Sequence, residues 1–102
     1  MKTIATPLPN IKRFSLLNAG ILTKVAVPSG TGIVTVKFID SSGKLAFEGT
    51  DGGTIGSIYI SITSDTFFEM DWANPGQINR AVREFYLAGD ENAVQVEVLV
   101  EE

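Results

Sequence analysis

The sequence predicts an all-β protein, an antiparallel two-layer β-sandwich of jelly-roll or immunoglobulin-like form with about seven or eight strands and an extended N-terminal arm. Valine and isoleucine alternate with polar residues along most of the chain, which places each apolar set on one face of a pleated strand. Clusters of Gly, Pro, Asn, Asp and Ser interrupt this alternation at roughly the spacing of turns between short strands. The length of 102 residues allows one domain.

The first segment, residues 1–12, is predicted to be an arm, and residues 13–102 form the single sandwich domain. Two prolines in the arm fix the backbone and cannot donate hydrogen bonds, and its apolar residues follow no strand period. The arm is either a terminus without contacts or a segment that lies in a groove of a neighbouring subunit. The partner contacts expected under the second interpretation are Ile4, Pro7, Leu8, Pro9 and Ile11.

The alternating segments that follow predict the strands of the sandwich. The first begins at Phe14 and closes at the turn residues 18–20. β-Branched enrichment supports a strand assignment for the others. In chain order they cover residues 24–27, 34–38, 45–47, 57–62, 67–72 and 94–101, each followed by turn residues or by the chain end.

Residues 77–88 fit two patterns. Ile78, Val82 and Phe85 have the spacing of a helical stripe. However, Pro and Gly precede this stretch and Gly follows it, which leaves room for a short strand over residues 82–87. We favour a loop followed by a strand, because a helix would interrupt an otherwise continuous series of strands.

Composition excludes several kinds of chemistry. Histidine and cysteine are absent, so the chain has no disulfide framework, thiolate nucleophile, histidine-based triad or zinc site with nitrogen or sulfur ligands. A serine–lysine arrangement is formally available with Lys24, Lys37 or Lys44, but nothing indicates a strained nucleophile turn. We therefore predict that the protein is not an enzyme and has no catalytic, cofactor or metal residues.

The acidic and glycine-rich motifs support the same prediction. Glu69 and Asp71 share one face of a predicted strand and could form a carboxylate pair or hold calcium. We interpret them as the solvated face of a strand whose other side carries Phe68, Met70 and Trp72 into the core. The Asp51-Gly52-Gly53 sequence lacks the further ligands of a calcium or phosphate loop and is interpreted as a glycine turn.

Charge is distributed unevenly along the chain. Residues 1–46 hold six basic residues and one acid, and residues 47–102 hold two basic residues and eleven acids. Either folding mixes the two halves, or the molecule has a positive and a negative side suited to contacts between copies. The net charge of −4 and the absence of a Lys/Arg cluster disfavour nucleic acid. The sequence predicts no signal peptide and no membrane segment, so we expect it to fold in a cytoplasm.

Two aromatic residues are candidates for stacking against a sugar ring. Trp72 falls on the apolar side of its predicted strand, which favours a core position. Tyr59 alternates with isoleucines and falls on the opposite side. Since aromatic side chains are enriched at interfaces, Tyr59 is a further predicted partner contact.

Several motifs resemble small tailed-bacteriophage virion proteins. Residues 14–20 and 24–30 resemble their opening, in which a strand ending in Ala-Gly leads into alternating valines that end in Val-Pro-x-Gly. Residues 67–73 resemble their aromatic strand, and residues 85–88 and 93–98 resemble their final strands. Asn74-Pro75-Gly76, with Arg80 and Arg83, resembles their Asn-Pro loop, although the usual Asp-Gly-Thr run before it is missing.

This resemblance implies a capsid decoration or cement protein without catalytic residues. Its expected partners are the major capsid protein and copies of itself, as a homotrimer that contacts the shell through the arm and one edge of the sandwich. The expected location is the virion, assembled in the host cytoplasm. Two alternatives stay open, a carbohydrate-binding or adhesion module that binds a glycan, and a tail or connector component of the virion.

Overall fold

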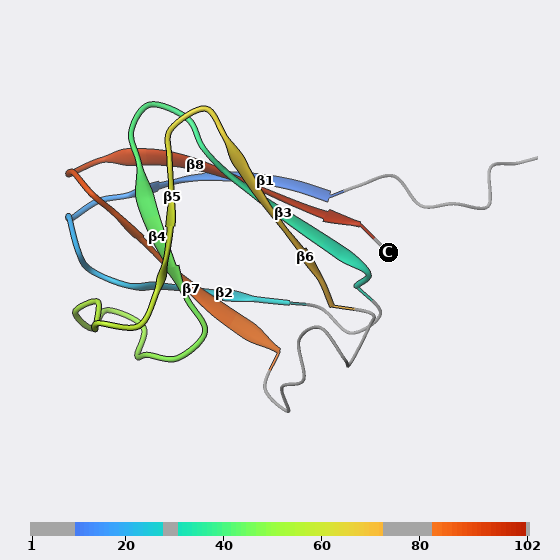
Figure 1. Ribbon diagram of the computed structural model, residues 1–102, viewed down its shortest axis with the longest axis horizontal. Helices are drawn as coiled ribbons and strands as arrows, with labels where there is room; N and C mark the ends of the chain where they lie inside the picture. The colour runs from blue at the N-terminus through green and yellow to red at the C-terminus, as the bar shows by residue number, and fades with distance from the viewer. Residues whose placement is uncertain (1–9, 28–30, 73–82, 102) are drawn as a thin grey trace, which may run out of the picture.

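Two antiparallel sheets pack face to face in this computed structural model, which describes residues 10–27, 31–72 and 83–101 (Figure 1). Each sheet has four strands, so the predicted all-β sandwich is confirmed, with eight strands in the described residues. None of these residues belongs to a helix that could cross a bilayer. The strands are β1 (Asn10–Leu16), β2 (Thr23–Ala26), β3 (Ile33–Phe38), β4 (Gly43–Ala46), β5 (Ile60–Ile62), β6 (Phe67–Asp71), β7 (Glu84–Gly89) and β8 (Val94–Glu101).

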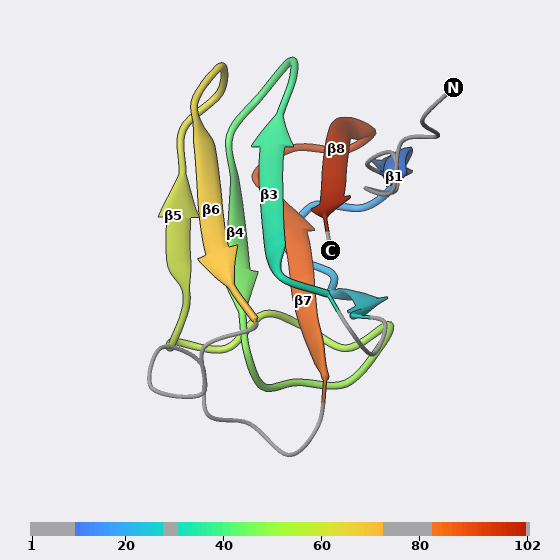
Figure 2. The same cartoon turned by 90° about the vertical axis from the view of Figure 1, so that its right-hand side faces the viewer.

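The strand order identifies the sandwich as a jelly roll. One sheet has the order β1-β8-β3-β6 and the other the order β2-β7-β4-β5. The pairs β1–β8, β2–β7, β3–β6 and β4–β5 are those of one long hairpin rolled into two layers, which is the jelly-roll arrangement. As a result, β1 and β2 lie at one lateral side of the molecule and β5 and β6 at the other (Figure 2). We call these the β1/β2 edge and the β5/β6 edge.

The core between the sheets is built from the alternating residues that the sequence singles out. In β3 and β8 the valines point inward, and the residues between them are less buried. Burying a valine or leucine side chain contributes about 1.5–3 kcal/mol, so these strands supply much of the stabilisation. The fully buried side chains with the largest volume are Phe38, Phe85, Leu16, Leu45, Leu87, Val34, Val36, Val94, Val96 and Val98.

The first strand begins earlier than the sequence predicts. β1 starts at Asn10, and Asn10, Ile11 and Lys12 pair with Val100, Leu99 and Val98 of β8. Residues 10–12 are therefore part of the sheet and not of an arm. The physical reason is that the chain can donate to a ladder again directly after Pro9. Residues 1–9, including the predicted contacts Ile4, Pro7, Leu8 and Pro9, lie outside the described residues.

The strand predicted over residues 82–87 is confirmed, and it runs from Glu84 to Gly89. The helical alternative for residues 84–88 is thereby excluded, whereas residues 77–82 lie outside the described part of the chain. β7 is buried on both faces, since Tyr86 and Ala88, which point away from the main core, are 5% and 0% exposed. A central strand of an open sheet with one solvated face would expose these residues.

A loop between β4 and β5 accounts for this second buried face. The backbone of residues 52–55 pairs with the chain that leads into β2: Leu22 N–H donates to the Gly53 carbonyl at 2.7 Å, and Ile55 N–H to the Gly20 carbonyl at 2.8 Å. Gly52, in the predicted glycine turn, has a φ of 85°, a conformation that glycine adopts without strain. The loop thereby encloses a second apolar cluster, made of Leu22, Ala46, Tyr86, Ala88 and Ile55.

Candidate contact surfaces at the two edges of the sandwich

The two edges of the sandwich carry opposite charge. Lys12, Arg13 and Lys24 are exposed at the β1/β2 edge. The turn before β6 and the outer face of β6 carry the exposed acids Asp65 and Glu69. Because this jelly roll places its first two strands at one edge and its fifth and sixth strands at the other, the charge asymmetry of the sequence becomes an asymmetry between the edge strands. The segregation is partial, because Lys37 on β3 and Lys44 on β4 lie opposite Phe67 and Ser61 beside the β5/β6 edge.

Some charges at the β1/β2 edge have neighbours that partly offset them. The Arg13 guanidinium forms an ion pair with Glu97 on β8, in which Arg13 Nε donates to Glu97 Oε2 at 3.1 Å. The Asp51 carboxylate accepts a hydrogen bond from the backbone N–H of Lys24 at 3.0 Å. The Arg13 side chain is 62% exposed, so this pair contributes only about 0–1 kcal/mol to stability. The guanidinium therefore keeps access to a partner outside the chain.

Two large apolar side chains are exposed on the outer face of the β1-β8-β3-β6 sheet. Ile11 on β1 is 64% exposed and Phe67 on β6 is 68% exposed. They come from opposite edge strands, and both line a shallow hollow of about 210 Å³. Ile11, a predicted partner contact, is thus accessible. The residues that line this hollow are Ile11, Thr35, Lys37, Phe67, Glu97 and Leu99.

A second hollow of about 450 Å³ lies between the two sheets at the β1/β2 edge. Its floor is apolar, since Phe14 of β1 and Val25 of β2 pack against the main core while remaining partly exposed. Lys12 and Lys24 also line it. This basic, apolar-floored groove was not predicted, because the sequence does not show that β1 and β2 end up side by side.

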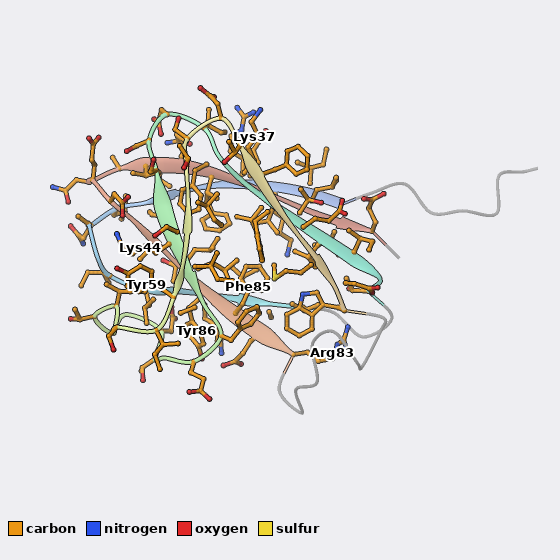
Figure 3. All side chains as sticks on the ribbon, in the orientation of Figure 1. Lys37, Lys44, Tyr59, Arg83, Phe85 and Tyr86 are labelled. Carbon is orange, nitrogen blue, oxygen red and sulfur yellow. The ribbon has the colours of Figure 1, made fainter. Side chains whose placement is uncertain are left out.

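A third hollow, of about 490 Å³, lies beside the β5/β6 edge, between β4 and residues 56–60. Tyr59 lines it and is 41% exposed, so the predicted exposure of this residue is confirmed. Its ring lies beneath the Lys44 ammonium, which is 5.3 Å from the ring centroid and also forms an ion pair with Asp90 (Figure 3). The cation–π contact with Lys44 orients the Tyr59 ring at the hollow.

Trp72 is a core residue, as its position in the alternation predicts. Its side chain is 5% exposed. The ring packs between Phe47 and Phe85, with centroid distances of 6.5 and 6.4 Å, and the Arg83 guanidinium lies 5.6 Å from its centroid. Its ring faces are covered, so of the two aromatic candidates for sugar stacking only Tyr59 is accessible.

The carboxylate pair and the serine–lysine arrangement considered in the sequence lie in strands and turns. Glu69 is exposed on the outer face of β6 and Asp71 is half-buried on the same face. Ser41 stands three residues before Lys44, a spacing found in serine–lysine hydrolases, but the Lys44 ammonium binds the Asp90 carboxylate. In the described ranges no three acidic side chains gather as metal ligands would.

A comparison of the chain with protein-family models, with curated proteins and with solved structures found no match.

Proposed function

We propose that this protein is a structural subunit of a tailed-bacteriophage virion, which decorates and stabilises the capsid shell as a homo-oligomer. The observation that carries the proposal is the placement of opposite charges and exposed apolar side chains at the two edges of a sandwich with a continuous core. Such edges suit contacts with neighbouring subunits. The class of assembly is supported by the resemblance of residues 14–30 and 67–98 to virion proteins.

The sandwich has the properties that a decorating subunit needs. Its core strands are tightly packed, and its loop between β4 and β5 is tied to the chain before β2 by backbone hydrogen bonds. β1 lies at one edge of its sheet and begins at Asn10. A homo-oligomer that contacts several capsid subunits at once gains avidity from individually weak contacts.

Co-sedimentation with undecorated capsid shells tests the proposal. We expect the purified protein to pellet with shells, to saturate at a fixed ratio to the major capsid protein, and to raise the temperature at which the shells fall apart. Shells already decorated in the cell serve as the control and should bind little more. A protein that never pellets with shells from the phage that carries its gene would overturn the proposal.

Two N-terminal deletions distinguish the contribution of the predicted arm from that of strand β1. Removing residues 1–9 should leave the thermal midpoint nearly unchanged and weaken shell binding. Removing residues 1–12 should also lower the free energy of unfolding by about 1–3 kcal/mol, because it removes the pairing of Asn10, Ile11 and Lys12 with β8. Calorimetry and co-sedimentation measure the two effects, and an equal loss of stability in both deletions would contradict the expectation.

Binding of a glycan is a second candidate function, favoured by the exposed Tyr59 ring beside the 490 Å³ hollow. Aromatic rings stack against the apolar faces of sugars. Titration of a panel of bacterial surface glycans, monitored by calorimetry, tests this candidate. A response in the wild type that is lost in Tyr59→Ala would support it, and no response across the panel would remove it.

A further inference from the structure

We infer that copies of this chain associate head to tail, with the outer edge of β1 in one copy pairing antiparallel with the outer edge of β6 in the next. The inference deepens the proposed function, because it specifies the contact through which the homo-oligomer would form. The contact extends the β1-β8-β3-β6 sheet from one copy into its neighbour.

The β1-β8-β3-β6 sheet has two open edges. Within the described residues β1 pairs only with β8, and β6 pairs only with β3. In the other sheet the start of β2 is covered by the loop between β4 and β5: Gly52 N–H donates to the carbonyl of Leu22, directly before β2, at 2.8 Å, and the Asp51 carboxylate accepts from Lys24 N–H. Open strand edges are ready-made templates for pairing with another chain, and the β1-β8-β3-β6 sheet offers one at each end.

The strand directions suit a head-to-tail contact. β1, β8, β3 and β6 are each antiparallel to their neighbours, so β1 and β6 run in opposite directions. A second copy placed in the same orientation beyond β6 therefore presents a β1 strand that is antiparallel to β6. The sheet continues across the junction with the geometry that it has inside each copy.

The side chains on the outer face of these two strands are complementary. On β1 this face carries Ile11 and Arg13, and on β6 it carries Phe67, Glu69 and Asp71. Since Glu69 and Asp71 are two residues apart, a shift of the register by two residues still brings Arg13 next to an acid. Opposite charges and apolar side chains placed across a strand pair are favourable, and two exposed hydrophobic residues become covered.

Like-with-like pairing of these edges is disfavoured by the same charges. A two-fold contact between two β1 strands brings Lys12 and Arg13 towards their own copies, and a contact between two β6 strands does the same for Glu69 and Asp71. Like charges directly opposite each other are destabilising. The favoured contact is thus heterologous, which closes into a ring such as the expected homotrimer or continues as a filament.

Charge reversal tests the junction. Glu69→Lys and Arg13→Glu should each raise the dissociation constant of self-association about tenfold at low salt, because each places like charges across the junction. The double variant Arg13→Glu/Glu69→Lys exchanges the two signs and should restore association. Glu91→Lys makes the same charge change as Glu69→Lys in the exposed turn between β7 and β8, and it should leave association unchanged. Sedimentation velocity over a concentration series measures each constant.

Arg13→Glu also places a carboxylate beside Glu97, so Arg13→Gln, which removes the positive charge without adding a negative one, serves as a second basic-edge variant and should also weaken association. Restoration by the double exchange supports the inference. A wild type that is monomeric at every concentration overturns it, as does a double variant no better than the singles. The proposed function fails separately, if the protein associates but never pellets with shells. A monomer that binds shells overturns only the head-to-tail contact.

Discussion

Replacing Gly43 with alanine is expected to lower the free energy of unfolding by about 3 kcal/mol. A Cβ atom at Gly43 would lie 1.9 Å from Cε2 and 2.3 Å from Cζ of Phe38. Phe38 belongs to the other sheet and is fully buried, so its ring cannot turn towards solvent to make room. Thermal unfolding of a domain of this size should then show a midpoint lowered by roughly 10–20 °C.

Two comparisons show whether this loss comes from the contact with Phe38. Gly56→Ala is the matched control, because a Cβ atom there meets nothing within 4 Å, and its midpoint should stay close to that of the wild type. In a Phe38→Leu background the same Gly43→Ala change should destabilise less, since the ring that blocks the methyl group is gone. An equal loss in both backgrounds would contradict the steric explanation.

The alternation of apolar and polar residues predicts the strands because every second residue of a strand in a two-layer sandwich faces the core. The valines of β3 and β8 and the inward position of Trp72 follow directly from it. The choice between jelly roll and immunoglobulin-like form does not follow, because it depends on which strands pair. The pairing of β1 with β8 joins residues at opposite ends of the chain, and no local pattern specifies that choice.

The second buried face of β7 also escapes prediction from the sequence. Tyr86 and Ala88 are buried because the loop between β4 and β5 crosses outside them and is held by hydrogen bonds to Leu22. A tyrosine and an alanine on the face opposite to Phe85 and Leu87 predict an ordinary solvent-exposed face of the sheet. The one local signal is the glycine turn, which shows that the chain bends there but not what it covers.

The sequence predicts the sign of the charge on each candidate surface but not the position of that surface in the fold. The sequence shows a basic first half and an acidic second half, and the exposure of Tyr59 follows from its alternation with isoleucines. Only the topology brings Lys12 and Lys24 to one groove and sets Glu69 at the opposite edge. Whether charge asymmetry along a chain becomes asymmetry across a molecule depends on strand order, which is a long-range property.

Replacing Tyr86 with alanine is expected to lower the free energy of unfolding by about 3–4 kcal/mol, and to release the loop between β4 and β5. Tyr86 is the largest buried side chain of the cluster that this loop covers, and its hydroxyl forms a hydrogen bond with the Glu84 carboxylate. Without the ring, the loop loses most of the apolar surface on which it lies. Hydrogen exchange should therefore accelerate at the Leu22, Gly52 and Ile55 amides, which bond across this contact.

Tyr86→Phe is the matched control, because it keeps the ring and removes only the hydroxyl. The expected loss is then about 0.5–1.5 kcal/mol, the usual contribution of one hydrogen bond, and the loop amides should stay protected. Amides in β3 and β8 belong to the main core and should report only the global loss of stability in both variants. If Tyr86→Ala accelerated exchange at the loop amides no more than at those of β3 and β8, the loop would be held by its backbone hydrogen bonds and not by the second cluster.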